Sequence, residues 1–344
     1  LDNGETKCWG DDVYGQLGDG GSATNINAPS STAIDLGTGR TAVALGGGKY
    51  HVCAILDNGE AKCWGRDNYG QLGDGGSNTD QGSPVAVSGS DTWDTTRTVS
   101  SGSGSGSGSS QSNFTSSVEG ADLYLDVPMT NITFQYNASA ASGSSGTSAF
   151  AYANDKVAAG YRHTCAILDN GDLKCWGSDS NGQLGDGGTS HNSNTGTTQP
   201  SSTPVNLGTG RTAVAVSSGN KHTCAILDNG DLKCWGRDYS GQLGDGGTNT
   251  DTNAPSSTAI DLGTGRTAVA VSAGSLHTCA ILDNGDLKCW GYDYYGQLGD
   301  GGTNPGTDLN APSSTPVNLG TGRTAVAVSS SYSHTCAILD NGDM

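Results

Sequence analysis

The chain is poor in apolar residues and in positive charge. Only 33% of its 344 residues are hydrophobic, whereas 56 are Gly. Globular chains usually have about 45–50% apolar residues, although that figure also counts Gly. A large single core of long helices is therefore excluded, whereas short strands joined by tight turns fit this composition.

Basic residues are few, and long apolar runs are missing. Lys and Arg number 16 against 34 Asp and Glu, which gives a formal charge of −18. Affinity for nucleic-acid phosphates comes mainly from Lys and Arg, so this balance argues against nucleic acid as a partner. No apolar run approaches the roughly 20 residues needed to cross a bilayer, which argues against membrane insertion.

One string of residues recurs along the chain. It reads His-Thr-Cys-Ala-Ile-Leu-Asp-Asn-Gly-Asp-Leu-Lys-Cys-Trp-Gly from His222 to Gly236. Full or half copies occupy residues 1–10, 51–65, 163–177, 277–291 and 334–344. Each Cys-Trp-Gly is followed by Gly-Gln-Leu-Gly-Asp-Gly-Gly. Self-similarity of this kind is the signature of repeat architectures.

Each repeat unit predicts four short strands. In the unit ending at Gly291 we expect them at residues 258–262, 267–271, 277–282 and 286–290, because these stretches are rich in β-branched residues or alternate, and Gly, Pro or Asn-Gly separates them. Repeated units of four strands are typical of propeller blades. One such sheet cannot bury both faces, but stacked neighbours can.

These spaced motifs resemble the repeat of the RCC1-like β-propeller family, everywhere except about residues 88–156. The resemblance implies an all-β RCC1-like β-propeller of four-stranded blades, usually seven, closed into a ring. This chain has about six blade-equivalents, or seven if sequence is missing, so a propeller-derived repeat array is the alternative. Nuclear members of the family act on a small GTPase and chromatin, a role for which we carry no residues over.

The repeats divide the chain into three parts. We expect RCC1-like repeats at 1–87, an atypical segment at 88–156 and further RCC1-like repeats at 157–344. The atypical segment lacks Cys and contains a Gly/Ser run at 101–110 that is typical of a flexible linker. It is either a degenerate blade, with short strands at 122–127 and 131–136, or an insert.

The atypical segment also contains three N-glycosylation acceptors, at Asn113, Asn131 and Asn137, and the repeats contain none. This clustering favours glycosylation if the source is eukaryotic.

The ten cysteines all belong to the repeat. In complete copies they lie ten positions apart, as Cys53 and Cys63, Cys165 and Cys175, Cys224 and Cys234, and Cys279 and Cys289. A three-residue hairpin loop at 228–230, with its Gly in a left-handed conformation, places Cys224 opposite Cys234. Opposed residues in antiparallel strands are within disulfide range.

Disulfides are therefore expected, and they indicate an oxidising, extracellular compartment or the cell surface. The alternative is a metal site formed by His222, Cys224 and Cys234. Zinc usually takes four ligands, and no fourth ligand recurs, so the disulfide is favoured.

Cys8 and Cys336 belong to half copies at the two ends of the chain. In one interpretation the ends complete a single blade, with Cys8 bonded to Cys336. In the other, which we favour because Leu-Asp-Asn-Gly occurs at both ends, the chain is a window from a longer array and both partners lie outside it. A longer array, or head-to-tail pairing of chains, can build a fibre.

The repeated polar and aromatic residues favour structural roles over catalysis, because a catalytic centre needs different groups converging on one point. We expect hydrogen bonding from His51, His163, His222, His277 and His334. We expect packing between blades from Trp9, Trp64, Trp176, Trp235 and Trp290, with a sugar-stacking rim as the alternative. The Gly-Thr-Gly-Arg segments at 208–211, 263–266 and 320–323 predict tight turns, since no helix follows to hold a phosphate.

No cofactor is expected. Asp245, Asn249, Asp251 and Asn253 offer oxygens to Ca²⁺, although a solvated turn is favoured. The first functional hypothesis is a non-enzymatic structural component of a cell surface or filament, which associates with itself. The alternative is a secreted or surface module that recognises protein or glycan through variable loops such as 189–202 and 303–314, since loops on a rigid scaffold often carry recognition.

Overall fold

The computed structural model describes residues 5–21, 24–95, 156–188, 196–302 and 306–341. Their strands, in chain order, are β1 (Ala42–Gly47), β2 (His51–Leu56), β3 (Ala61–Gly65), β4 (Gln81–Ala86), β5 (Val157–Ala159), β6 (His163–Ile167), β7 (Leu173–Gly177), β8 (Ala213–Ser218), β9 (His222–Leu227), β10 (Leu232–Gly236), β11 (Ala268–Ala273), β12 (His277–Leu282), β13 (Leu287–Gly291), β14 (Ala325–Ser330) and β15 (Thr335–Leu339). In these parts of the chain no helix is long and apolar enough to cross a membrane.

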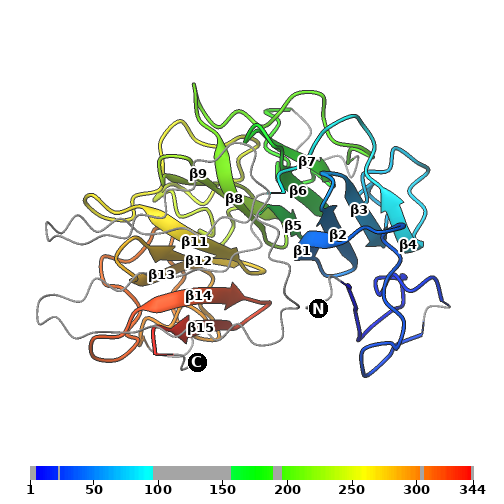
Figure 1. Ribbon diagram of the computed structural model, residues 1–344. Coiled ribbons are helices and arrows are strands. Elements are labelled where there is room, and N and C mark those ends of the chain that lie inside the picture. Colours follow the sequence, from blue (N-terminus) through cyan, green and yellow to red (C-terminus); the bar gives the residue numbers. More distant parts are fainter. Residues whose placement is uncertain (1–4, 22–23, 96–155, 189–195, 303–305, 342–344) are drawn as a thin grey trace, which may run out of the picture.

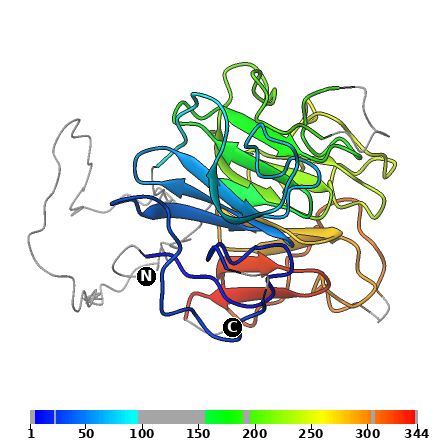
Figure 2. The ribbon, with the colours of Figure 1, turned by 90° about the vertical axis from the view of Figure 1, so that its right-hand side faces the viewer.

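The strands form a row of small antiparallel sheets. Each sheet pairs strands that are neighbours in the chain, in the orders β1-β2-β3-β4, β5-β6-β7, β8-β9-β10, β11-β12-β13 and β14-β15. The sheets follow one another in an arc from β1–β4 to β14–β15 (Figure 1) and are layered when seen from the side (Figure 2). The first strand of each sheet packs against the first strand of the next. The all-β propeller architecture expected from the repeats is confirmed.

One predicted strand is wrong. Residues 258–262 are irregular, and the amide of Ile260 donates one isolated hydrogen bond to the carbonyl of Leu232 at 2.9 Å. Before it, Pro255 has no N–H, and the Ser256 hydroxyl accepts the amide of Thr258 at 3.2 Å. These local features compete with the sheet ladder. Among the described residues, a regular fourth strand is formed only by β4.

The hairpin register is the one that the cysteine spacing predicts. Cys234 lies opposite Cys224, and Leu232 lies opposite Ile226. The amide of Leu227 donates to Asp231 at 2.9 Å, so three residues form the loop. Gly230 has a φ of 82°, a left-handed conformation that glycine adopts without steric cost.

Four disulfides join the second and third strands of their sheets. They link Cys53 to Cys63, Cys165 to Cys175, Cys224 to Cys234 and Cys279 to Cys289. In each pair the Cα atoms are 4.1 Å apart, as expected for directly opposed residues.

The remaining two cysteines, Cys8 and Cys336, form no disulfide in this structure, so the clasp, which was the less favoured interpretation, is not formed here. Cys8 is partly buried beside Ile34 and Leu56, and this burial raises the pKa of its thiol. Cys336 is instead exposed on β15. The two thiols therefore lie in different surroundings.

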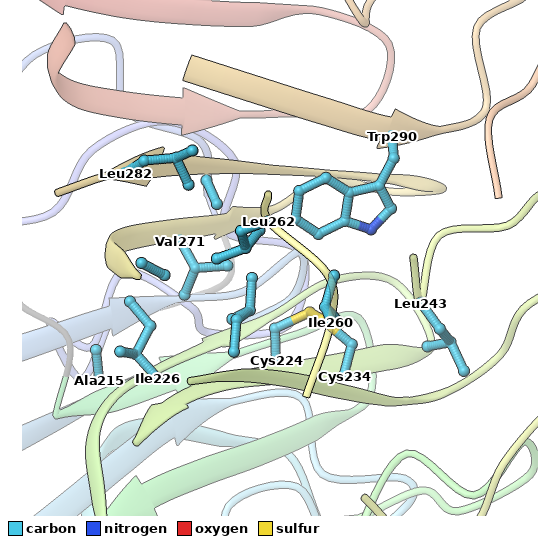
Figure 3. Packing of buried hydrophobic residues seen from close by; sticks show 13 residues of the cluster. Ala215, Cys224, Ile226, Cys234, Leu243, Ile260, Leu262, Val271, Leu282 and Trp290 are labelled. Carbon is cyan, nitrogen blue, oxygen red and sulfur yellow. A yellow bond between two sulfur atoms is a disulfide. The ribbon is translucent and has the colours of Figure 1, made fainter. Parts of the chain in front are cut away.

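The core lies between neighbouring sheets. Ile226 and Leu243 of the β8–β10 repeat unit, and Ile260, which hydrogen-bonds to Leu232 of that sheet, pack against Val271 and Trp290 of the next sheet (Figure 3). The indoles of Trp64, Trp176, Trp235 and Trp290 are fully buried, so packing between blades is confirmed for them and a sugar-stacking rim is wrong. Trp9 is 58% exposed.

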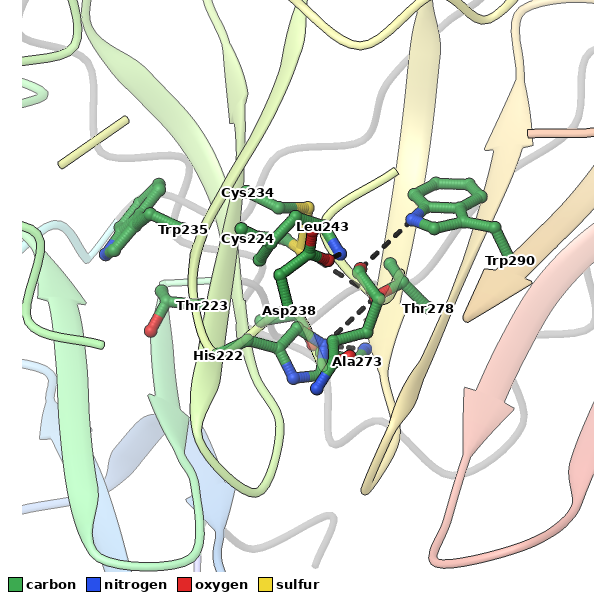
Figure 4. The surroundings of a disulfide bond; sticks show 12 residues. His222, Thr223, Cys224, Cys234, Trp235, Asp238, Leu243, Ala273, Thr278 and Trp290 are labelled. Carbon is green, nitrogen blue, oxygen red and sulfur yellow. Dashed lines mark hydrogen bonds between the residues drawn. A yellow bond between two sulfur atoms is a disulfide. The ribbon is translucent and has the colours of Figure 1, made fainter. Parts of the chain in front are cut away.

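A chain of hydrogen bonds also joins neighbouring units. His222 Nε2 lies 3.0 Å from Thr278 Oγ1, which donates to the Gln242 carbonyl at 2.9 Å. The Trp290 indole donates to the same carbonyl at 3.1 Å (Figure 4). Equivalent bonds run from His51 through Thr164 to Gln71, from His163 through Thr223 to Gln183, and from His277 through Thr335 to Gln297. We call this arrangement the His–Thr–Gln relay.

The relay fixes the protonation of its histidines. Because the Thr278 hydroxyl gives its hydrogen to Gln242, it accepts from His222, whose Nε2 must then carry the proton. Nδ1 of each relay histidine is buried and has no hydrogen-bond partner. Burial lowers the pKa of His163 and His222 to about 3 and that of His51 and His277 to about 4. These histidines are neutral and structural, as the sequence predicts.

Residues 88–95 pack against the repeat sheets. Trp93 is buried against Trp176, with ring centroids 5.5 Å apart. Asp91 and Asp94 form ion pairs with Lys174 and Lys156 at 2.8 Å. The sequons at Asn113, Asn131 and Asn137 lie outside the described residues, as do the strands expected at 122–127 and 131–136.

Replacing Cys224 and Cys234 together with Ala should lower the free energy of unfolding by about 2–3 kcal/mol, because a disulfide that closes a short loop restricts the unfolded chain by about that amount. Urea unfolding followed by Trp fluorescence measures the loss. Cys336→Ala is the control: it removes an exposed, unpaired thiol and should leave stability within about 0.5 kcal/mol of the wild type. Equal losses in both variants would contradict the structural role of the bridge.

Acid should destabilise the chain through its buried histidines. Between about pH 4 and 6.5 these histidines are protonated in the unfolded chain but stay neutral in the folded chain. Each therefore lowers the free energy of unfolding by about 1.4 kcal/mol for every pH unit of acidification. Asp67 and Asp238 oppose this, because burial raises their pKa to about 6 and about 7, and the folded chain keeps their protons until higher pH.

The contribution of one histidine can be isolated with His222→Gln, whose amide can donate to Thr278 but does not titrate. The slope of unfolding free energy against pH should fall by about 1.4 kcal/mol per pH unit in that window. An unaltered slope in His222→Gln would show that this site does not contribute.

Candidate functional site

Each sheet has two chemically different ends. At one end the relay histidine lies opposite the Gly of Cys-Trp-Gly, as His222 does opposite Gly236. We call this the His end. At the other end lies the Asp-Asn-Gly hairpin loop, and we call this the Asn-Gly end.

The Asn-Gly end carries neutralised charges. The arginine of each Gly-x-Gly-Arg turn faces the aspartate of the hairpin loop, and the N–O distances are 3.3–3.6 Å. These pairs are Arg40 with Asp57, Arg211 with Asp228, Arg266 with Asp283, and Arg323 with Asp340. The amide of Arg211 donates to the carbonyl of Gly208 at 3.2 Å, so the segment forms the tight turn that the sequence predicts.

The His end collects the aromatic residues of the surface. All tyrosines of the described chain occupy the turn before a repeat histidine or the loop after Cys-Trp-Gly. They are Tyr14, Tyr50, Tyr69, Tyr161, Tyr239, Tyr292, Tyr294, Tyr295 and Tyr332. Neighbouring backbone bonds, such as Arg66 N–H to the Tyr50 carbonyl at 2.9 Å, hold the turn and the loop side by side.

Five cations share this end with the tyrosines. They are Lys49, Arg66, Arg162, Lys221 and Arg237. Within the described residues none of them forms an ion pair. We call these cations and the tyrosines of the previous paragraph the tyrosine face.

The cations stack on the tyrosine rings across two sheets. Arg66 lies 4.6 Å from the Tyr14 ring centroid and 5.2 Å from that of Tyr50. Lys49 lies 5.0 Å from Tyr50 and 4.9 Å from Tyr161. Cation–π contacts at these distances contribute about 0.5–1 kcal/mol each at exposed sites, so the stack is held in one arrangement.

The stack continues over the β5–β7 sheet and then changes character. Arg162 lies 4.7 Å from the Tyr161 centroid and 4.4 Å from that of Tyr69. Beyond Arg237 the face carries no further cation in the described residues, and Tyr294 and Tyr295 pack edge to face at 5.0 Å. The face thus has a cationic half over β1–β10 and a tyrosine half over β11–β15.

Aspartates at this end are already engaged by the backbone. Asp80 accepts the amide of Asp67 at 2.8 Å, and Asp251 accepts the amide of Asp238 at 2.9 Å. Asp238 in turn accepts the amide of Leu243 at 2.9 Å. Because an aspartate with this role recurs in the loop of each unit, the raised pKa values of Asp67 and Asp238 mark loop structure and not an acid–base pair.

The oxygens considered for Ca²⁺ also serve the loops. Asp245 accepts the amide of Gly247 at 2.7 Å, Asp251 accepts from Asn181 at 2.6 Å, and Asn253 donates to the carbonyl of Gly188. In the described ranges no three His, Cys, Asp or Glu side chains are placed to hold a metal ion.

Sequence reasoning missed the tyrosine face. It concentrated on residues that recur in every repeat, whereas the face consists of neighbouring residues that differ from one repeat to the next. The signal was available. One of the two positions before four of the five repeat histidines holds Tyr50, Arg162, Lys221 or Tyr332, and the position after three of the five Cys-Trp-Gly copies holds Arg66, Arg237 or Tyr292. Within the predicted recognition loops 189–202 and 303–314, the described residues Thr197 and Leu309 lie at this same end, since they bridge to Gly177 and Gly291.

Several known proteins resemble this chain. The ultraviolet-B receptor UVR8 of Arabidopsis thaliana is 27% identical over 305 residues, which cover 88% of this chain and 52% of the receptor. The human E3 ubiquitin-protein ligase HERC2 is 29% identical over 188 residues, 55% of this chain and 4% of the ligase. The chain therefore spans about half of the length of the first relative and a small part of the second.

Solved structures agree on the fold. Human WBSCR16 superposes with a TM-score of 0.65 at 18% identity, covering 96% of this chain and 66% of that protein. Prp20p of Saccharomyces cerevisiae superposes with a TM-score of 0.64 at 16% identity, covering 97% and 64%.

Two family models, both described as the Regulator of chromosome condensation (RCC1) repeat, match the chain. One matches residues 170–226, 229–281 and 284–338, and the other matches 41–71, 155–183, 213–242 and 268–297. Together they cover more than half of the sequence. The chain belongs to the RCC1 repeat family.

Proposed function

We propose that the chain is a non-enzymatic module that binds another protein through its tyrosine face. The observation that carries this proposal is the concentration of the described tyrosines and of five cations without ion pairs at one end of the blades. A face of this kind would otherwise leave aromatic rings such as Tyr239, 74% exposed, in water.

Protein is the favoured ligand because of the residue types. Tyr and Arg are enriched at the cores and energetic centres of protein interfaces. The structure of Prp20p is described together with its binding to Gsp1p and histones, so a propeller of this fold is compatible with protein recognition. A glycan-binding face, the other form of this hypothesis, is not favoured, because the four indoles that it would need are buried.

We further propose that the module works outside the reducing cytosol. Four disulfides within one chain are characteristic of extracellular or other oxidising compartments. The repeat body then comprises 5–95 and 156–341, with the segment between β4 and β5 carrying sugars at Asn113, Asn131 or Asn137. Sugars on that segment would be compatible with this location.

The binding proposal can be tested with matched double variants. Tyr50→Ser with Arg162→Ser alters the tyrosine face, and Arg211→Ser with Asp228→Ser alters the Asn-Gly end. The immobilised chains are exposed to medium and cell-surface extracts of the producing cells, and retained proteins are identified by mass spectrometry. Wild type and the Asn-Gly variant should retain the same proteins, and the face variant should lose them at least about tenfold.

Matching thermal unfolding of the three chains ensures that the comparison reports binding. Retention that is equal in both variants, or lost only at the Asn-Gly end, would contradict the proposal.

A structural component of a surface or filament is the second candidate function. The observation that favours it is the pair of unbonded cysteines, of which Cys336 is exposed on β15 next to the exposed Ile338. An exposed thiol in an oxidising compartment can join chains.

This second function predicts a ladder of disulfide-linked chains when native material is separated by electrophoresis without reductant. Cys336→Ser should collapse the ladder, whereas Tyr50→Ser should not. A single monomer band from native material would exclude thiol-linked assembly.

A further inference from the structure

The arginines in the cationic half of the tyrosine face differ from those at the Asn-Gly end. At the Asn-Gly end, four arginines each face an aspartate at 3.3–3.6 Å. At the His end, Arg162 and Arg237 contact rings but no carboxylate. The chain has a net charge of −18, and the cations of this half form no ion pair within the described residues.

Arg162 shows how such a cation is prepared for a ligand. Its guanidinium lies over the rings of Tyr69 and Tyr161, and Nη2 is 3.5 Å from the Tyr161 hydroxyl. Its Nε is buried and has no hydrogen-bond partner within the described residues. Because Nε is buried, a ligand carboxylate would bind at the Nη1–Nη2 edge of the guanidinium, which can donate to both carboxylate oxygens.

Neighbouring cations crowd the same place. The pKa of Lys221 is lowered by burial, by Arg237 and by Arg162, in that order, while Asp251 partly opposes the effect. Like charges held together repel one another, and an incoming carboxylate would relieve that repulsion. The fold therefore holds these three cations together against their mutual repulsion. A ligand carboxylate would reduce that repulsion and stabilise all three cations.

We infer that the cationic half of the tyrosine face, centred on Arg162, Lys221 and Arg237, binds a peptide segment rich in Asp and Glu. This inference rests on the proposed protein-binding function and names the chemistry of its partner. Carboxylates would meet the guanidinium edges, and the tyrosines between the cations would contact the apolar parts of the peptide.

A dense polyanion fits the face less well. Asp80 and Asp251 belong to the same end of the blades, Asp251 acts on Lys221 as a nearby negative charge, and the chain as a whole is acidic. A peptide can space its carboxylates to meet the cations and avoid these aspartates. A sulfated glycan or a nucleic acid carries charge at every unit and cannot.

Fluorescence anisotropy tests the inference with a labelled peptide whose Asp and Glu residues are separated by Gly and Ser. The control peptide has the same length and carries Asn and Gln in place of Asp and Glu. The protein variants are Arg162→Gln with Lys221→Gln at the face, and Arg211→Gln with Arg266→Gln at the Asn-Gly end. Each pair removes two positive charges, so the change in net charge is matched.

The acidic peptide should bind the wild type and the Asn-Gly variant alike, and the face variant should bind roughly tenfold more weakly. Affinity should fall as salt rises, and the Asn/Gln peptide should not bind. Equal weakening in both variants would show a mere effect of net charge and overturn the site. Binding of heparin but not of the acidic peptide would overturn the peptide in favour of a sulfated glycan.

The outcome is separable from that of the proposed function. If the acidic peptide does not bind the wild type, while Tyr50→Ser with Arg162→Ser still loses the captured proteins, the peptide chemistry is wrong and the binding face stands. If neither protein capture nor peptide binding depends on the face, both proposals fail.

Discussion

The structure depends on the His–Thr–Gln relay, because no repeat unit completes it alone. His222 and Gln242 come from one unit, and Thr278 and Trp290 come from the next. If one residue of the relay is removed, the polar atom that it contacted becomes a buried group without a hydrogen-bond partner, which destabilises the fold. Sheets of two to four short strands, each too small to be stable in isolation, are thereby tied into one body.

The disulfides stabilise individual sheets. The relay joins sheets to one another, whereas each bridge fixes a hairpin within its own sheet, as Cys224–Cys234 does between β9 and β10. A chain with only 33% hydrophobic residues has little apolar surface with which to hold such hairpins. Covalent links within sheets and buried hydrogen bonds between sheets together compensate for the sparse core. This division of roles explains why the same letters recur in every unit.

The sequence alone predicted the features that depend on residue spacing within one repeat unit. Ten positions between Cys224 and Cys234, with Gly230 between them, determined the hairpin loop and its register. Contacts between units could not be derived in the same way. The carbonyl of Gln242 accepts from Thr278 and Trp290, 36 and 48 positions away, and nothing local in Gly-Gln-Leu indicates it. The β-branched residues of segment 258–262 predicted a strand. The missing N–H of Pro255 and the hydroxyl of Ser256 oppose one there, so the segment is irregular.

The position of the tyrosine face follows from the roles of the relay and the disulfides. Apart from Val52, which stands at the position of Thr278, the residues of the relay and the bridges are the same in every complete unit, because changing them would leave a buried group unpaired. Surface positions are free to differ between units. At the His end those positions are the residue or two before the histidine and the residue after Cys-Trp-Gly. Tyr50, Arg66 and Arg162 occupy them, and their stacking adds contacts between units without touching the relay. A binding surface placed there can change its chemistry while the repeat that supports it stays the same.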